Sequence, residues 1–458
     1  MPGFFICFSR QTYKVLKPYR FKREVFPNSF RYLPNSKRMK VLLKQARILA
    51  PLSPFHGHQK DISIVNGSIE RIANKIDPEG HQIISSPHLH VSTGWVDVFA
   101  DFGEPGNEHR ETIESGIKAA AAGGFTDVLL IPDSKPPVSN RSQVAYIRHQ
   151  SEQSAVTLHP IGAVSKDLQG TELAEMYDMA EASAVAFSDG LHPVQHSGLL
   201  LKALQYVLPV NSNIIQLPVD RNLSKNGLIN EGVVSTKLGM PGKPSLAEEL
   251  AVHRDLQLLA YTNSRLHFTG ISTAKSLDQI TEAKKQTLRV TYSVTPYHCW
   301  FHDEVLTNYD TRFKVDPPIR SATDRDAVRK AVIEGRVDCF ASHHQPRDWD
   351  EKTCEFEYAK YGMEGLETAF GVYNSLGASP ELIIAMLTDK PRSIFSLHQP
   401  KIEENTPACI TIFDPEIRWV PTEAIIRSRS KNNGFLGLEL KGKVLGIINK
   451  GHFISNEE

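Results

Sequence analysis

The central part of the chain alternates short apolar runs with stretches of helical periodicity, and this alternation restricts the fold more than any other feature. Strands that alternate with helices are typical of parallel sheets. Eight such runs lie between residues 91 and 398, which predicts an α/β fold with a (β/α)8 TIM-type barrel. The predicted strands are 96–102, 127–132, 157–164, 184–188, 213–219, 266–271, 289–295 and 337–342. The predicted helices include 110–122, 198–207, 246–261, 273–285 and 324–334.

Short alternating strands also lie near both ends of the chain. Two of them, 60–65 and 68–72, flank an Asn66-Gly67 turn that is typical of a hairpin. Runs of the same kind return at 408–413 and 443–448. We therefore predict that residues 40–90 and 400–455 form one composite β-sandwich domain beside a barrel of residues 91–398.

The first 38 residues differ from the rest of the chain, because they contain nine basic residues and a single acid, Glu24. Their apolar stretch is too short and too early for a secretory signal. An organellar transit peptide is one interpretation. We favour a disordered or mis-called extension, with translation starting at Met39, because an ordinary strand begins at Lys40.

Composition excludes several classes of function. Lys plus Arg and Asp plus Glu both number 52, so no net charge attracts nucleic acid or an anionic membrane. A small neutral ligand or a protein partner is the better expectation. The five cysteines form no Cys-x-x-Cys pair, which argues against a disulfide framework and a thiolate zinc site and favours a reducing cytoplasm. No apolar run reaches the roughly 18 residues of a membrane span.

Specific motifs surround the first predicted strand. The segment Gly94-Trp-Val-Asp-Val-Phe-Ala-Asp-Phe-Gly-Glu-Pro-Gly106 is followed by Glu111-Thr112 and by Ala119-Ala-Ala-Ala-Gly-Gly-Phe-Thr126. This frame resembles the dihydroorotases of the amidohydrolase superfamily, whose pattern is Asp-x-His-x-His-Leu-Arg-Glu-Pro-Gly. Further family motifs, including Glu364-Gly-Leu-Glu-Thr368, follow in order across residues 40–455. The resemblance implies a barrel with a flanking β-domain, a binuclear metal site and a place in pyrimidine biosynthesis.

The positions that hold the metals in the family have changed here. The residues at these positions are Phe99, Asp101, Asp189, Leu217, Gly270 and His343. Phenylalanine, leucine and glycine side chains have no lone pair to give a metal ion. His343 stands where the family has an aspartate that is both ligand and proton shuttle. We therefore predict no bound metal or other cofactor and no catalytic residue.

The positions that bind substrate in the family have changed with them, and they form a predicted relict pocket. Its residues are Gly103, Asp133, Asp316, Arg320 and Arg347. By the resemblance, Gly103 replaces an arginine, Asp133 and Asp316 replace asparagines, and Arg347 replaces a histidine. A carboxylate at Asp133 would repel the carboxylate of a dihydroorotate-like substrate.

Two interpretations of these residues remain open. Asp101, Asp189, His343 and His344 could form a rearranged site for one zinc ion. We favour the alternative, in which His343 and His344 are hydrogen-bonded in a relict cleft and Asp101 is solvated.

The remaining histidines and arginines receive ordinary structural interpretations. We expect His88 and His90 to lie in a linker, and His298 and His302 to lie in a loop packed over the barrel. Arg320 and Arg347 could bind an anion, but surface salt bridges are the commoner role of arginine.

The sequence thus predicts a cytoplasmic, non-catalytic dihydroorotase homologue that acts as a structural or regulatory subunit and assembles into homo-oligomers. The resemblance implies aspartate carbamoyltransferase as the partner, since non-catalytic homologues in the family assemble with that enzyme. A remodelled metal-dependent cyclic amidohydrolase is the second hypothesis, and conventional dihydroorotase activity is the third.

Overall fold

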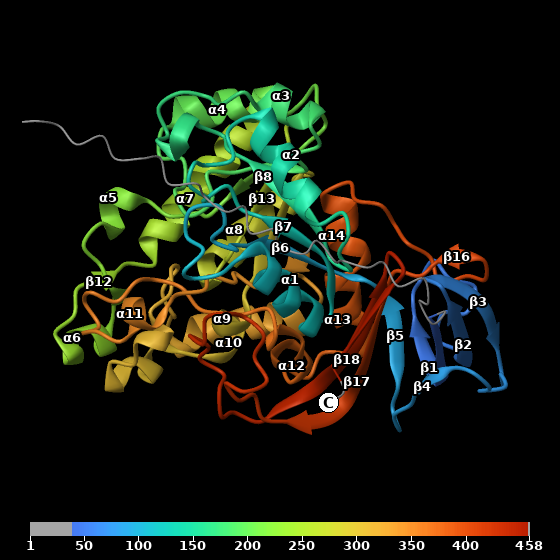
Figure 1. Ribbon diagram of the computed structural model, residues 1–458. Coiled ribbons are helices and arrows are strands. Elements are labelled where there is room, and N and C mark those ends of the chain that lie inside the picture. Colours follow the sequence, from blue (N-terminus) through green and yellow to red (C-terminus); the bar gives the residue numbers. More distant parts are fainter. Residues whose placement is uncertain (1–38, 457–458) are drawn as a thin grey trace, which may run out of the picture. The chain divides into compact units, whose positions relative to one another are not determined.

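The computed structural model describes residues 39–456, and the prediction for residues 1–38 lies outside this range. Eight parallel strands form one sheet in the order β15-β14-β13-β10-β9-β8-β7-β6 (Figure 1). Their bounds are β6 Trp95–Ala100, β7 Phe125–Leu130, β8 Thr157–Gly162, β9 Ala186–Phe187, β10 Ile214–Gln216, β13 Leu266–Phe268, β14 Val290–Val294 and β15 Cys339–Phe340. The predicted α/β barrel is confirmed. Most strands are shorter than predicted, because their carboxyl ends turn into the loops that carry the site residues.

The sheet closes through contacts between its first and last strands. The backbone N–H and the hydroxyl of Ser342, just after β15, donate to the two carboxylate oxygens of Asp97 in β6 at 2.6 and 2.9 Å. The backbone N–H of Asp101 donates to the carbonyl of His344 at 2.9 Å. These bonds place the ends of the first and eighth strands side by side.

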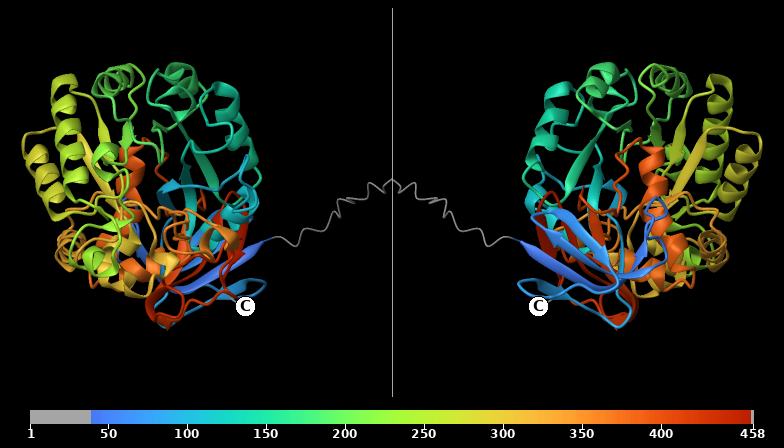
Figure 2. Two further views of the ribbon diagram at one scale, coloured as in Figure 1. Left: turned by 90° about the vertical axis from the view of Figure 1, so that its left-hand side faces the viewer. Right: turned by 90° about the vertical axis from the view of Figure 1, so that its right-hand side faces the viewer.

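Helices surround the barrel, as the end-on views show (Figure 2). They are α1 Ile113–Ala122, α2 Arg141–Gln150, α3 Met176–Glu181, α4 Ser197–Tyr206, α5 Arg221–Ser224, α6 Val233–Leu238, α7 Leu246–Thr262, α8 Ala274–Lys285, α9 Pro296–Trp300, α10 Ala322–Ile333, α11 Trp349–Lys352, α12 Ala369–Asn374, α13 Pro380–Leu387 and α14 Asp389–Ile394. Short 3-10 turns occur at Lys166–Leu168, Asp303–Asn308 and Thr311–Phe313. Side-chain caps begin several helices: Thr112, Asn140, Thr273 and Ser321 each accept a backbone N–H from the first turn.

Strands from both ends of the chain meet in a second sheet, which forms the β-rich second domain. Its order is β16-β3-β2-β1-β5-β17-β18-β19, with β4 paired to β1. The strands are β1 Lys40–Leu49, β2 Gln59–Val65, β3 Ser68–Ala73, β4 Gln82–Ile84, β5 His90–Thr93, β16 Thr406–Pro407, β17 Ile410–Trp419, β18 Leu440–Asn449 and β19 His452–Ser455. A separate small pair joins β11 Ile229–Asn230 to β12 Gly242–Lys243. The linker assignment was wrong for His90, which begins β5 and stacks on Phe413 of β17.

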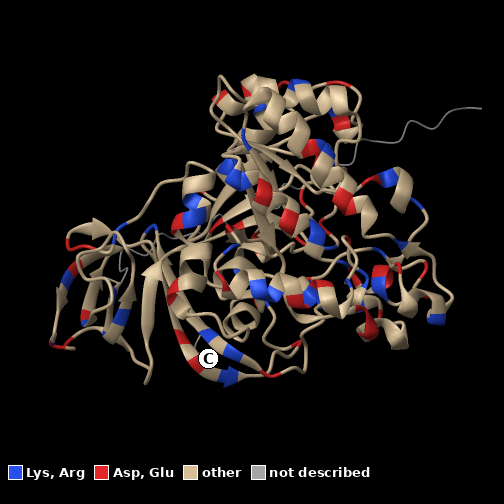
Figure 3. Ribbon diagram, turned by 180° about the vertical axis from the view of Figure 1, so that it is seen from behind, with Lys and Arg blue, Asp and Glu red and all other residues tan. Residues whose placement is uncertain are grey.

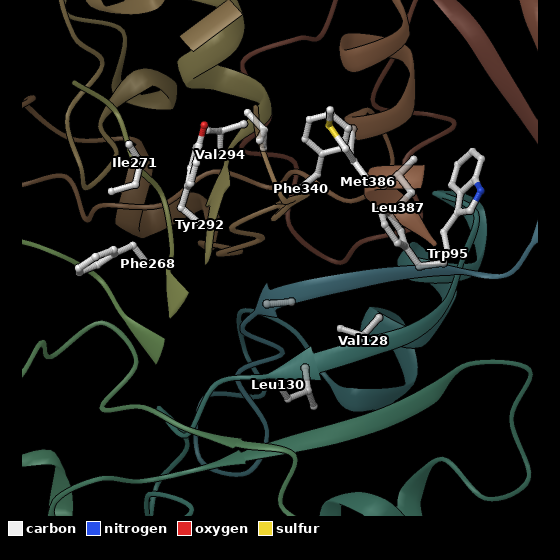
Figure 4. Packing of buried hydrophobic residues seen from close by; sticks show 14 of the residues in the cluster. Trp95, Val128, Leu130, Phe268, Ile271, Tyr292, Val294, Phe340, Met386 and Leu387 are labelled. Atoms are coloured by element: carbon white, nitrogen blue, oxygen red, sulfur yellow. The ribbon is translucent and has the colours of Figure 1, made fainter. Parts of the chain in front are cut away.

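Two apolar layers hold the barrel together. The larger lies between the strands and the surrounding helices, and Figure 4 shows part of it, including Trp95, Tyr292 and Phe340. The smaller layer consists mainly of side chains from the barrel strands and the residues that directly follow them, including Phe99, Ile161 and Ile215. Phe99, which the resemblance places at a metal-ligand position, thus belongs to the apolar core.

Within residues 39–456, no helix has both the length and the apolar character needed to cross a bilayer. Lysine and arginine are interspersed with aspartate and glutamate along the ribbon (Figure 3).

Candidate functional site

Three of the six residues at the metal-ligand positions pack against one another at the carboxyl ends of the strands. The rings of Phe99 and His343 stack with their centroids 4.6 Å apart. Gly270 lies against the edge of the same histidine, because a Cβ built on it would come within 2.7 Å of His343 Cε1. Leu217 is also buried, with 1% of its surface exposed. Carbon atoms therefore occupy most of the space where a metal site would be expected.

His343 is held in the neutral form. Its Nε2 atom lies 2.7 Å from the hydroxyl of Thr269, and that hydroxyl accepts a hydrogen bond from Ser293 at 3.1 Å. Ser293 in turn lies 3.1 Å from Nε2 of His267, so a chain of hydrogen bonds crosses the strand ends. Burial lowers the pKa of His343 to about 3, with smaller contributions from the two buried histidines His298 and His267.

Asp189, which by the resemblance is the one metal-ligand position that keeps its family residue, has its oxygens engaged elsewhere. One oxygen accepts the backbone N–H groups of Val164 and Ser165 at 2.9 and 2.8 Å, and the other accepts the hydroxyl of Ser165. Burial raises the pKa of Asp189 to about 6 in spite of these bonds. The carboxylate anchors the end of the third barrel strand.

Asp101 and Asp133 form a pair of acidic residues near Asp189. Asp101 is 7% exposed and accepts the backbone N–H of Gly103 at 2.7 Å, so the expectation that it is solvated was wrong. Gly103 has a φ of 70°, a left-handed conformation that glycine adopts without strain. Burial raises the pKa of Asp133 well above its usual range, and the nearby charge of Asp101 adds to the effect. Arg347 is close enough to oppose it.

The other predicted pocket residues have partners of their own. Asp316 forms ion pairs with Lys243 at 2.9 Å and with Arg221 at 3.0 Å, and these cations hold its pKa below the usual range although burial opposes them. Arg320 is 4% exposed and pairs with the buried Glu248 at 3.3 Å. Arg347 donates to the carbonyl of Tyr361 at 2.6 Å, and its side chain is 10% exposed. Both arginines form salt bridges, Arg320 with Glu248 and Arg347 with Glu351 at 3.8 Å, but these side chains are largely buried, so only the expected surface location was wrong.

His344 lies in a buried charge cluster that the sequence did not predict. Its Nε2 lies 3.4 Å from Glu111, and its Nδ1 lies 3.7 Å from Glu364. Burial alone would lower the pKa of His344, but the two carboxylates outweigh it and raise the pKa to about 10. Both glutamates belong to the motifs Glu111-Thr112 and Glu364-Gly-Leu-Glu-Thr368, which is the signal that could have identified them.

His298 is also a structural residue, although it lies in the short helix α9 where a loop was expected. Its Nδ1 atom lies 2.9 Å from the hydroxyl of Thr295, and its Nε2 atom lies 3.1 Å from the carbonyl of Pro318. Burial lowers its pKa to about 4. The histidine therefore joins α9 to the segment that carries Asp316 and Arg320.

Similar solved structures agree with the barrel and its β-rich second domain. The L-hydantoinase (dihydropyrimidinase) from Arthrobacter aurescens superimposes with a TM-score of 0.79 at 21% identity, over 91% of this chain and 96% of that one. Dihydropyrimidinase from Brevibacillus agri NCHU1002 gives 0.74 at 17% identity, over 91% and 95%. At these identities the likeness concerns the fold alone.

Relatives found by sequence share a higher identity with this chain than these solved structures do. A family model described as dihydro-orotase-like matches residues 90–276. A dihydroorotase of Syntrophus aciditrophicus (strain SB) is 38% identical over 427 residues, which cover 92% of this chain and all of the relative. This chain belongs to the dihydroorotase family. A second dihydroorotase, from Pelotomaculum thermopropionicum, is 38% identical over 424 residues, or 92% of this chain and 99% of that one.

The residues of this dihydroorotase homologue do not fit the binuclear metal site that the family implies. Phe99, Leu217 and Gly270 offer no donor atom, and the oxygens of Asp189 are already bonded to Ser165 and its backbone. Across the part of the chain that the structure describes, no group of three or more His, Cys, Asp or Glu side chains is arranged to hold a metal ion. No chemical step through a metal can be derived from this donor set.

Three buried neutral histidines predict sensitivity to acid. The pKa values of His267 and His343 are lowered to about 3 and that of His298 to about 4, mainly by burial. Below about pH 6.5 these histidines bind protons in the unfolded chain but stay neutral in the folded chain, so the free energy of unfolding falls as the pH falls. Each histidine should contribute roughly 1.4 kcal/mol per pH unit below pH 6.

Urea denaturation between pH 7 and 5 measures this slope. In a His343→Asn variant, the slope of unfolding free energy against pH should be smaller by the contribution of one histidine. Replacement of the exposed His149 by asparagine should leave the slope unchanged. Equal slopes for the wild type and His343→Asn would contradict the assignment of a neutral buried imidazole.

Proposed function

We propose that this chain is a non-catalytic member of the dihydroorotase family that serves pyrimidine biosynthesis as a structural or regulatory subunit in the cytoplasm. The packed contact among Phe99, Gly270 and His343 carries the proposal. A hydrolase of this family needs lone-pair donors that converge on a metal and lower the pKa of a bound water. Here an aromatic stack and a glycine fill that region.

The proton shuttle gives independent support. A base that accepts a proton from an attacking water needs a pKa near the working pH. The imidazole of His343 has its pKa lowered to about 3 and lies against the ring of Phe99 and the hydroxyl of Thr269. At neutral pH it is a very weak base. The aspartate that the family uses at this position would be an anion, so the exchange removes both the charge and the basicity.

The framework around the lost site is intact, which favours a role for the folded protein itself. Buried networks at Asp189, Asp316 and His344 still join the strand ends to their loops. Two aromatic side chains after β15, Trp349 and Tyr358, are 74% and 71% exposed. Large exposed aromatic side chains are typical of protein contact sites. Aspartate carbamoyltransferase is the first partner to test, and self-association into a homo-oligomer is the second.

Metal content and turnover test the loss of catalysis. Protein purified without chelator should contain far less than one zinc or similar ion per chain, and it should not interconvert dihydroorotate and carbamoyl aspartate with or without added zinc. A 38% identical relative such as the Syntrophus aciditrophicus dihydroorotase, prepared in the same way, is the control. Metal-dependent turnover would refute the proposal. Stoichiometric metal without dihydroorotate turnover would support a remodelled hydrolase that uses Asp101, Asp189 and His343.

Co-purification tests the partner. Tagged protein from its native cytosol should bring down aspartate carbamoyltransferase, and the complex should persist in size-exclusion chromatography. A Trp349→Ala variant should weaken the complex if the exposed aromatic side chain takes part. Recovery of the protein without any carbamoyltransferase would count against the partner but not against the loss of catalysis, which the metal and turnover measurements decide separately.

A further inference from the structure

A partly enclosed cavity lies between the second sheet and the short helix α12, and none of the residues at the predicted metal-ligand positions lines it. The long strand β18 runs beside α12 (Figure 1). The cavity has a volume of about 280 Å³. Its walls are Ala122, Glu367, Phe370, Gly371, Trp419, Ile425, Ile426, Arg427, Gly442, Lys443, Val444 and Asn456.

Most of these walls are apolar and rigid. Phe370, Ile426 and Val444 are buried, and the indole of Trp419 is fixed by a hydrogen bond from Nε1 to the carbonyl of Gly442 at 2.8 Å. The amide of Asn456 donates to the carbonyls of Ala122 and Val444 at 2.8 and 3.2 Å, which closes one side. A cavity with fixed aromatic and aliphatic walls suits a small ligand whose apolar group is a flat ring or an aliphatic chain.

Two cations line the same cavity, and neither forms a salt bridge within the described residues, although Asp414 stands opposite Lys443 in the β17–β18 register. Lys443 is half-buried and Arg427 is exposed, so Arg427 lies at the rim. The neighbouring Lys441, in contrast, pairs with Glu416 at 2.9 Å. An unpaired lysine beside apolar walls is a suitable site for an anionic group.

The one acid in the walls does not cancel this positive charge. Glu367 accepts the backbone N–H groups of Arg427 and Ser428 at 2.8 Å. Burial raises its pKa, and the adjacent Glu364 adds to the effect, which weakens the negative charge of Glu367 at neutral pH.

We propose that this cavity binds a small organic anion with one flat or aliphatic body, whose charged group lies against Lys443 and Arg427 and whose apolar part contacts Trp419 and Phe370. A carboxylate and a phosphate monoester satisfy the same chemistry. The site does not depend on the proposed loss of catalysis. Its occupancy would affect the barrel through Ser428, since this neighbour of Arg427 also bonds to Glu111 beside His344.

Ligand-observed NMR on the full chain tests the site with single-ring probes. Benzoate and phenyl phosphate represent the two anions, benzyl alcohol supplies the ring without charge, and inorganic phosphate supplies charge without a ring. At least one aromatic anion should give saturable binding, at least tenfold tighter than benzyl alcohol and inorganic phosphate. The tighter of the two anions identifies the charged group of the natural ligand.

Two lysines on one strand provide a matched pair of variants. Lys443→Met should weaken binding of the preferred anion at least tenfold, whereas Lys441→Met should leave it unchanged, because Lys441 does not line the cavity. Circular dichroism and thermal melting report whether each variant keeps its fold. If Lys443→Met does not fold, Arg427→Gln at the exposed rim takes its place. Absence of saturable binding, or equal affinities in the wild type and Lys443→Met, would overturn the proposal.

Discussion

A His344→Leu variant should lose about 3–5 kcal/mol of unfolding free energy, because it removes the one cation from a buried cluster of carboxylates. Glu111 and Glu364 lie 3.4 and 3.7 Å from the two ring nitrogens, and all three side chains are fully buried. Seryl hydroxyls and backbone N–H groups would still hold Glu111, but none of these donors carries a compensating charge. Urea denaturation at pH 7 measures the loss.

Two controls separate charge from packing. A His344→Leu, Glu111→Gln, Glu364→Gln triple variant should recover part of the lost stability, since it removes the uncompensated carboxylates together with the cation. The adjacent His343→Asn should cost only about 1–2 kcal/mol, because that imidazole is neutral and its loss leaves one hydroxyl without its partner. A His344→Leu variant within about 1 kcal/mol of the wild type would mean that the histidine is not charged in the folded protein.

The pH dependence provides an independent test of the same cluster. The folded pKa of about 10 lies above the unfolded value of 6.5, so the contribution of His344 is fully present below about pH 6.5. It is lost as the pH rises through 10. The wild type should therefore lose stability between pH 7 and 10 more steeply than His344→Leu does.

The barrel could be predicted from sequence because its signal is local and repeated. Each strand is an apolar run, and helices such as α7 and α8 carry their own periodicity and caps. The ends of the strands could not be placed in the same way. β9 keeps only two of the five predicted residues, since the chain leaves the sheet early to bring Asp189 to the end of the third strand.

The candidate site was only partly accessible from the sequence. Motif order predicted that Phe99, Leu217 and Gly270 stand at metal-ligand positions, because a substitution in a known frame is visible without coordinates. The partners of the charged residues were not visible, since Glu248 is 72 residues from Arg320 and Glu111 is more than 230 residues from His344. Burial depends on such long-range pairs, which explains why both arginines were expected at the surface and Asp101 in solvent.

A Gly270→Ala variant should lose about 2–5 kcal/mol, although it adds a single methyl group. Gly270 has a φ of 69°, where a side chain costs about 1–2 kcal/mol, and the new Cβ would come within 2.7 Å of His343 Cε1. An unrestrained ring could turn aside. This one is fixed by its stack on Phe99 and its bond to Thr269, so the overlap should cost about 1–3 kcal/mol more.

Gly239 is the matched control for this prediction. Its φ is 65°, and a Cβ there would meet no atom within 4 Å, so Gly239→Ala should show the backbone cost alone. In a His343→Asn background the cost of Gly270→Ala should fall to that of Gly239→Ala, which makes the coupling between the two positions about 1–3 kcal/mol. Equal costs for the two alanine variants in the wild-type background would contradict the close packing. By the resemblance, Gly270 replaces a ligand histidine. If a methyl group is too large there, a histidine at this position would also require replacement of His343.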